Sequence, residues 1–156
     1  MTDIVDAVTR SRMMSGIRGV NTKPERHVRS LLHREGFRFR LHARELPGRP
    51  DIVMPRYRAV IFVHGCFWHG HACHLYRLPS TRPEFWSAKI ERNKQNDKAA
   101  IEALQACGWR VATVWECALK GRQSCTDVMI RSILGGWLRG ESEVLELTGR
   151  GDQGDA

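Results

Sequence analysis

Twelve residues near the middle of the chain, 63–74, have the sequence V-H-G-C-F-W-H-G-H-A-C-H. The segment contains four histidines, two cysteines and an adjacent Phe-Trp pair. Thiolate and imidazole groups bind metals such as zinc, and imidazole also gains and loses protons near neutral pH. Core segments consist mainly of aliphatic and aromatic side chains. The composition of this segment therefore predicts chemistry or metal binding.

A second candidate for chemistry is Asp51, which follows Pro50 at the start of an apolar segment. A carboxylate at the end of a strand can bind a hard cation through oxygen. The alternative is that 48–51 is an ordinary turn in which Asp51 has only a capping role, and the segment taken alone favours this alternative. The next apolar segment ends at Val63 and His64, which brings a main-chain carbonyl and an imidazole to the same edge.

The elements that must position these groups follow from the hydrophobic pattern. Thr22-x-x-Glu25 is a capping-box pattern that begins a helix. The remaining elements are expected as strands where apolar residues alternate or run continuously and as helices where they recur every three to four residues. In chain order we expect a helix at 22–36, strands at 37–42, 51–54 and 59–63, a helix at 83–107, a strand at 109–115 and a helix at 126–138. This order predicts a single α/β domain with a mixed central sheet flanked by helices.

Charge divides the chain into three parts. The net charge is +8, and residues 1–50 hold eleven Lys and Arg against five Asp and Glu. We expect a basic N-terminal arm at 1–20, a folded domain at 21–140 and an acidic, disordered tail at 141–156. A basic body attracts phosphate backbones through counterion release, which favours nucleic acid as a partner. The alternative is a charged surface that serves only solubility.

Other compositional features limit the location of the protein. No apolar run approaches the roughly 20 residues that a membrane helix needs, and no apolar signal core begins the chain. Five cysteines without a secretory context argue against a disulfide framework and leave metal ligation or buried thiols. We therefore expect a soluble, cytoplasmic protein without membrane contact.

Several segments resemble a known nuclease family. A helix acid, a Pro-Asp hairpin and a third strand with a catalytic end resemble the restriction-endonuclease-like fold of the PD-(D/E)XK superfamily, although Phe62, Val63 and His64 occupy positions where that superfamily has an acid, a carbonyl and a lysine. One branch departs in this manner, the very-short-patch repair (Vsr) endonucleases. The segments similar to that branch are LPGRPD (46–51), HGCFWHGH (64–71), TRPEFW (81–86) and GWRV-x-x-VWECAL (108–119), and the likeness extends from about Thr9 to Trp137.

The resemblance implies a substrate and a reaction. Vsr enzymes nick DNA on the 5′ side of the T in a T:G mismatch, which arises when 5-methylcytosine is deaminated. Hydrolysis with two Mg²⁺ ions suits such a cut, because paired ions activate the water and stabilise both the attacking and the leaving oxygen at the phosphorus. The resemblance further implies double-stranded DNA with a T:G mismatch as the partner, a monomer acting on this asymmetric site, and mismatch-repair proteins as candidate helpers.

The family pattern assigns catalytic roles to particular residues. We expect Asp51 and the Val63 carbonyl to bind Mg²⁺, with His64 near the scissile phosphate in place of the superfamily lysine. We expect His69 to deprotonate or orient the attacking water. Two acids are expected to support them: Asp97 by holding the His69 ring, and Glu25 by reaching the Mg²⁺ cluster through water. The alternatives are a solvated helix acid at Asp97 and a purely capping role for Glu25.

The soft ligands predict a second metal site. Thiolates and imidazoles are poor ligands for Mg²⁺ and good ones for Zn²⁺. With the family pattern, we expect one structural zinc bound by Cys66, His71, Cys73 and Cys117. The residues alone leave other ligands open, namely His74, Cys107 and Cys125.

Large aromatic residues flank the histidines. Exposed on a DNA-binding face, aromatic side chains can wedge between base pairs, and a mismatched pair costs less to unstack than a matched one. In an arbitrary protein they would more often belong to the core. The resemblance instead implies DNA contact by the wedge residues Phe67, Trp68 and Trp86, by Lys89 and Asn93 on the following helix, and by Met14 of the arm.

Two other functions fit the same residues. One is a related restriction-type or branched-DNA nuclease that uses the same metal site on a different substrate. The other is a non-catalytic, zinc-stabilised nucleic-acid-binding module. Asp51 beside His64 and His69 disfavours the module, because binding alone does not require these groups.

Overall fold

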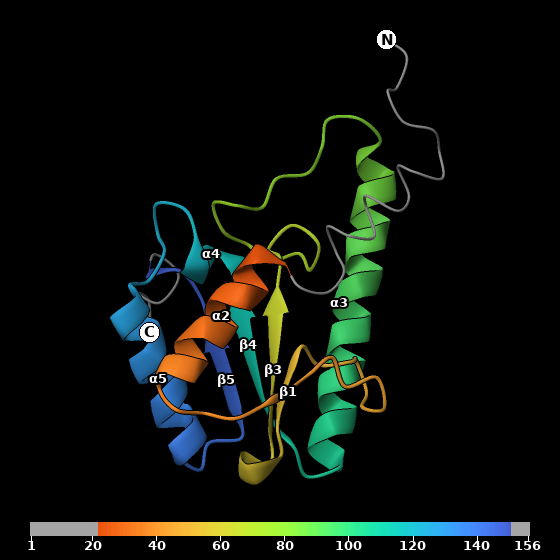
Figure 1. The fold of residues 1–156 in the computed structure, drawn as a ribbon. Coiled ribbons are helices and arrows are strands. Elements are labelled where there is room, and N and C mark those ends of the chain that lie inside the picture. The colour runs from red at the N-terminus through yellow and green to blue at the C-terminus, as the bar shows by residue number, and fades with distance from the viewer. Residues whose placement is uncertain (1–21, 151–156) are drawn as a thin grey trace, which may run out of the picture.

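The structure is a computed structural model that describes residues 22–150 (Figure 1). The expected arm at 1–20, with Met14, lies outside the described residues. The elements are α2 (Lys23–Arg34), β1 (Arg40–Leu41), β2 (Ile52–Met54), the 3₁₀ turn η1 (Pro55–Tyr57), β3 (Ala59–His64), α3 (Pro83–Ala106), β4 (Arg110–Trp115), α4 (Glu116–Leu119), α5 (Asp127–Arg139) and β5 (Val144–Leu147).

One mixed sheet of five strands forms the centre of the fold, in the order β1-β2-β3-β4-β5. β1, β2 and β3 pair antiparallel, whereas β4 runs parallel to β3 and β5 runs parallel to β4. A parallel pair needs a crossover connection, and α3 supplies it between β3 and β4. The predicted α/β class with a mixed sheet and flanking helices is confirmed.

Helices cover both faces of the sheet (Figure 1). α2 and α5 lie on one face and α3 lies on the other. β3 is buried on both faces because its alternate side chains enter different cores: Ile61 packs with α2 and α5, and Val60 and Phe62 pack with Leu104 of α3. A continuous apolar run such as AVIFV is typical of a strand buried on both sides.

The first strand is shorter than expected. The pattern at 37–42 predicted a full strand, but only Arg40 and Leu41 pair with β2. Phe37 is buried in the main core, whereas Leu41 is 40% exposed. His42 has a left-handed backbone conformation with φ of 51°, which ends the extended segment directly after Leu41.

The expectation of a disordered tail from residue 141 is wrong for its first part. Val144–Leu147 forms β5, which extends the sheet beside β4. Leu145 and Leu147 lie two residues apart and therefore point to the same face, where both contact the main core. The acidic residues around this segment led to the prediction of disorder, although Leu145 and Leu147 alternate with other residues and pack against the core at the sheet edge.

α3 is the longest helix within 22–150, with 24 residues. Gly108, with φ of 86°, follows its C-terminus, and β4 begins two residues later. Ile90 and Leu104 are its only buried residues, so most of its surface is polar. No helix in the described part of the chain is long and apolar enough to cross a membrane.

Candidate active site and metal centre

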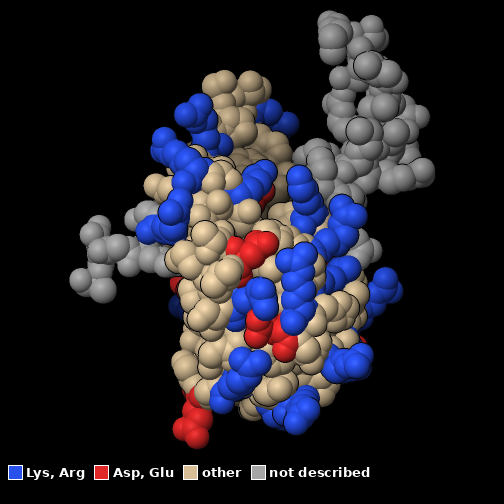
Figure 2. Space-filling model, turned by 60° about the vertical axis from the view of Figure 1, so that its left-hand side comes forward, with Lys and Arg blue, Asp and Glu red and all other residues tan. Residues whose placement is uncertain are grey.

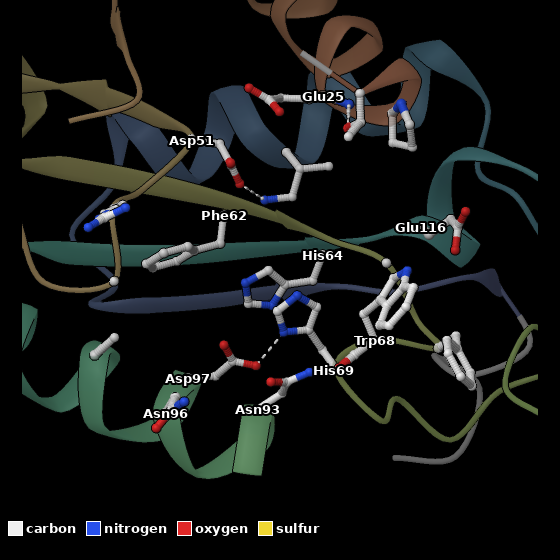
Figure 3. A pocket seen from close by; sticks show the side chains of 18 of the residues that line it. Glu25, Asp51, Phe62, His64, Trp68, His69, Asn93, Asn96, Asp97 and Glu116 are labelled. Carbon is white, nitrogen blue, oxygen red and sulfur yellow. Dashed lines mark hydrogen bonds and ion pairs between the residues drawn. The ribbon is translucent and has the colours of Figure 1, made fainter. Parts of the chain in front are cut away.

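A cleft opens at the end of β3, between α2 and α3 (Figure 3). Its volume is about 800 Å³. Figure 3 shows Glu25 of α2 and Asp51 on one side of β3, and Asn93 and Asp97 of α3 on the other side of the two histidines. The lining includes these residues sought from the sequence: Glu25, Asp51, Val63, His64, Phe67, Trp68, His69, Asn93 and Asp97.

Asp51 is tied directly to the end of β3. Its Oδ2 atom accepts a hydrogen bond of 2.7 Å from the backbone N–H of Val63. In an extended strand the N–H and the carbonyl of one residue point to the same side, so the Val63 carbonyl faces the strand edge on which Asp51 lies. Burial raises the pKa of Asp51 to about 6 despite this hydrogen bond, and the nearby Glu25 charge adds to the rise. A cation beside Asp51 would offset the cost of burying its charge.

The Glu25 side chain makes contacts that are not part of the helix cap. Its backbone N–H receives the expected cap from Thr22 Oγ1, at 3.4 Å. Its side chain, only 2% exposed, accepts hydrogen bonds from Arg29 and His42 instead of turning back to the cap. One ligand atom from each of Glu25, His42 and Asp51 lies within 4.8 Å of the other two. The two acids therefore form a compact oxygen-rich cluster.

His69 and Asp97 form a pair across the cleft. His69 Nδ1 lies 2.5 Å from Asp97 Oδ2, as the dashed line in Figure 3 shows. An Nδ1–H that donates to the carboxylate leaves Nε2 of the ring as a free base. The His64 ring stacks on His69 with centroids 3.7 Å apart and planes at 5°. Burial, with a smaller contribution from the His69 charge, holds the pKa of His64 well below its usual value.

Four soft ligands form the second cluster, namely Cys66, His71, Cys73 and Cys117. Both Cys66 Sγ and Cys117 Sγ lie 3.6 Å from His71 Nδ1. A tetrahedral zinc with ordinary bond lengths places its sulfur and nitrogen ligands about 3.6 Å apart, so this arrangement fits the ion. The hydrogen bond from Cys66 lowers the pKa of Cys117 to about 6, which favours the thiolate.

The alternative zinc ligands lie outside this cluster. Cys107 is exposed at the C-terminal end of α3. Cys125 is buried and donates its thiol to the Thr148 carbonyl at 3.5 Å. His74 Nδ1 lies 3.1 Å from Gln123 Oε1. The arrangement therefore favours the set containing Cys117 over the other ligands that the residues left open.

The expected wedge residues form one aromatic cluster. Ring centroids of Phe67, Trp68 and Trp86 lie 5.0–5.8 Å apart in tilted and edge-on pairs. All three side chains are half-buried rather than enclosed in the core. Edge-on packing supports each ring while leaving part of its surface accessible.

The two expected base-contacting residues of α3 also have partners in the protein. Asn93 Nδ2 donates a hydrogen bond of 2.8 Å to the Trp68 carbonyl. Lys89 Nζ lies 5.9 Å from the centre of the Trp86 ring. The Asn93 hydrogen bond fastens the loop that carries Trp68 to α3, whereas the Lys89 contact lies within α3 itself.

The sequence analysis missed two residues that the structure brings to these sites. His42 meets Glu25, although its place at the end of the FRFRLH alternation indicated only an outward-facing side chain. Glu116 lines the cleft, and its Oε1 accepts a 3.3 Å hydrogen bond from the Cys66 backbone. Its position immediately before Cys117 was the one available signal.

Comparisons with known proteins identify the class. A family profile described as DNA mismatch endonuclease Vsr matches residues 2–75. The chain is 46% identical over 151 residues to the DNA mismatch endonuclease Vsr of Escherichia coli (strain K12), which covers 97% of each chain. It is 51% identical over 134 residues to the Type II nicking enzyme V.XorIIP of Xanthomonas oryzae pv. oryzae (strain KACC10331 / KXO85), covering 86% of this chain and 98% of the relative.

A third relative is the Type II nicking enzyme V.NmeAIP of Neisseria meningitidis serogroup A / serotype 4A (strain DSM 15465 / Z2491). It is 40% identical over 133 residues, covering 85% of this chain and 95% of the relative. Together these matches define a DNA endonuclease, a hydrolase of phosphodiester bonds. The chain belongs to the Vsr family of DNA mismatch endonucleases, and the resemblance that its motifs indicated is confirmed.

Proposed function

We propose that this protein recognises a T:G mismatch in double-stranded DNA and nicks the strand on the 5′ side of the T by Mg²⁺-dependent hydrolysis. Two kinds of observation support this proposal. The relatives carry the descriptions mismatch endonuclease and nicking enzyme. The carrying observation is the cleft itself, in which Asp51 and Glu25 lie on one side of β3 and the His69–Asp97 pair lies on the other.

The oxygen donors suit Mg²⁺. Asp51, the carbonyl of Val63 and, through water, Glu25 would hold the two ions, because Mg²⁺ prefers carboxylate and carbonyl oxygen with several retained waters. When bound, the ions supply an activated water and neutralise charge at the phosphate. The buried Asp51 carboxylate has a raised pKa, which is expected of an acid whose counter-ion is a metal.

His69 is the candidate general base. The Asp97 carboxylate holds the Nδ1–H, so that the Nε2 lone pair can take a proton from the attacking water or orient it. Asp97 would also stabilise the imidazolium that forms. This arrangement favours the supporting role for Asp97 over a simple solvated helix acid.

His64 would act near the scissile phosphate. A lysine such as the one whose position it takes is normally protonated near neutral pH, whereas burial lowers the pKa of His64 and keeps the ring neutral. A neutral imidazole contributes a hydrogen bond rather than a full charge. Its stacking against His69 would also fix the plane of the base.

The Cys/His cluster would hold one structural zinc. Its four ligands come from the loop after β3 and from α4, so an ion there joins two segments that are far apart in sequence. This loop carries His69, Phe67 and Trp68. A zinc bound where this loop begins would therefore hold in place both the candidate general base, His69, and the wedge residues Phe67 and Trp68.

DNA contact would involve the aromatic cluster and the basic surface around the cleft. On the face in Figure 2, Lys and Arg side chains surround a small group of Asp and Glu side chains. The basic groups attract the phosphate backbone. The wedge residues insert between neighbouring base pairs, which is easier where a mismatch weakens the stacking. Lys89 and Asn93 would then meet the mismatched bases, and the arm with Met14 would press from the opposite groove.

The test uses paired duplexes that differ in one base. The protein is incubated with Mg²⁺ and either a T:G or a T:A duplex, each strand is end-labelled, and the products are mapped to the nucleotide. We expect one nick, 5′ of the T, in the T:G duplex alone and none when EDTA replaces Mg²⁺. Equal cutting of both duplexes would favour the restriction-type alternative, and binding without cutting would favour the non-catalytic module.

A further inference from the structure

The end of β1 provides a residue that contacts both acids of the cleft. His42 follows β1 directly, and its backbone N–H donates a hydrogen bond of 3.1 Å to the carbonyl of Asp51. Its φ of 51° is a left-handed conformation that non-glycine residues seldom adopt. Such conformations persist where surrounding contacts enforce them, and they cluster at functional sites.

The side chain of His42 extends from this backbone toward α2. Its Nε2 atom meets Glu25 Oε1, which also accepts a hydrogen bond from Arg29. The Glu25 side chain is 2% exposed, and the His42 side chain is 22% exposed. Contact with a carboxylate oxygen requires a proton on Nε2, so His42 donates and Glu25 accepts.

His42 lies behind the acids rather than in the cleft. Glu25 and Asp51 both line the cleft, whereas its lining within 22–150 does not include His42. Arg29 Nη2 also approaches His42 Nε2 to 3.2 Å, so two protein groups already contact this ring nitrogen. These contacts suit a residue that acts through the acids and not as a metal ligand itself.

We infer that His42 is a positioning residue for the catalytic metal cluster, because one residue holds Asp51 through its backbone and Glu25 through its side chain. This inference rests on the proposed Mg²⁺-dependent function and deepens it. Groups that orient the ligands of a metal site typically contribute about 10–100-fold to metal affinity or activity. Losing the side-chain hydrogen bond would let Glu25 turn away while leaving Asp51 in the sheet.

Two amide variants separate the hydrogen bond from the backbone conformation. His42→Asn tolerates the left-handed conformation but is too short to reach Glu25, whereas His42→Gln keeps a donor at nearly the length of histidine. The matched control is His27→Ala. His27 lies in α2, the helix that also carries Glu25, and the substitution removes its contact of 2.8 Å with the Asp127 carboxylate. Folding of every variant is checked by circular dichroism and thermal unfolding.

The readouts are the Mg²⁺ dissociation constant of the DNA-free protein, by calorimetry, and the half-saturating Mg²⁺ concentration for nicking. We expect both to rise about tenfold in His42→Asn, to return toward wild type in His42→Gln and to stay unchanged in His27→Ala, with the KM for DNA unaffected. An unchanged dissociation constant in a folded His42→Asn protein, or no recovery in His42→Gln, would overturn the inference alone. A wild-type protein that neither binds Mg²⁺ nor needs it for nicking would overturn the proposed function as well.

Discussion

His69 Nδ1 lies 2.5 Å from Asp97 Oδ2, which joins the loop after β3 to the middle of α3 over 28 residues of sequence. The pair faces Asp51 across the end of β3, where Val63 donates its N–H to the Asp51 carboxylate. A candidate base with its orienting acid thus shares one cleft with a candidate metal-binding acid. The chemistry of this cleft can be tested one group at a time.

Replacing Asp97 should impair the candidate general base, His69, without removing it. In Asp97→Asn we expect the kcat for nicking to fall about 10²-fold, because the amide no longer favours the tautomer with a free Nε2. His69→Ala should lower kcat by roughly 10²–10⁴-fold, and the double variant should be little worse than His69→Ala because the two residues act as a unit. Single-turnover kinetics measure these rates. Gln95→Ala, at an exposed position on the same helix, is the control, and additive effects would contradict the pairing.

Replacing Asp51 should abolish nicking. In Asp51→Ala we expect no measurable nick while the circular dichroism spectrum and mismatch binding remain near those of wild type, because the carboxylate serves the reaction and not the core. Gel-shift assays with a T:G duplex measure binding separately from cutting. Retained cleavage by Asp51→Ala would refute the assignment of this residue to the metal.

The ionised carboxylate of Asp51 should lower the free energy of unfolding of the Mg²⁺-free protein above neutral pH, compared with a neutral side chain at this position. Burial raises the pKa of Asp51 from 3.8 to about 6, so the folded state binds its proton more tightly than the unfolded state does. Stability from this group is fully present below pH about 4 and is lost as the pH rises through about 6. Asp51→Asn should therefore be more stable than wild type at pH 7.5, by an amount on the order of 1–3 kcal/mol, and equal at pH 4. Urea unfolding in Mg²⁺-free buffer measures the difference, and equal stability at pH 7.5 would contradict it.

Zinc should be present at about one ion per chain in purified protein. Cys117→Ser should lose the ion and unfold at a lower temperature, because the loop after β3 and α4 would no longer be joined. Cys107→Ser, at an exposed position, should keep both zinc and stability. Metal analysis and thermal unfolding provide the measurements. A zinc-free wild-type protein that folds stably would refute the site.

The segment after β5 should slow the release of this zinc. Gly149 donates its backbone N–H to Cys117 Sγ at 3.2 Å, and Arg150 donates its own to the Gln123 carbonyl at 2.7 Å. A chain ending at Leu147 should lose the ion to a chromogenic chelator about 10-fold faster than a chain ending at Arg150. Equal release rates would show that the segment does not support the thiolate.

Truncation of the arm tests its part in binding. Without residues 1–19, affinity for a T:G duplex should fall while the unfolding temperature stays close to that of the full chain. The salt dependence of binding should also weaken, by about 0.9 in logarithmic slope for each DNA phosphate that the arm neutralises in the full chain. Fluorescence anisotropy over a range of salt concentrations measures both quantities. Unchanged affinity would reject the arm as a DNA-binding element.

The sequence by itself determined the kinds of chemistry and the main elements. Soft ligands in 63–74 indicate zinc whatever the fold, because ligand preference is a property of the side chain. The continuous apolar run in β3 and the Thr22 cap of α2 are local patterns that need no partner to be recognised. The family motifs added the reaction, and the comparisons confirmed the family.

Only the tertiary structure decided which distant groups meet. The contact of His42 with Glu25 and that of Gly149 with Cys117 were not predicted, because they depend on how the sheet is ordered and how the segments pack. The pairing of His69 with Asp97 was expected from the family resemblance, and the structure adds its geometry. The strand at 144–147 likewise becomes stable only because β4 offers it a partner edge and a core face. Contacts between residues far apart in sequence depend on which strands become neighbours and on how the helices pack, and the pattern of one segment does not determine its partner.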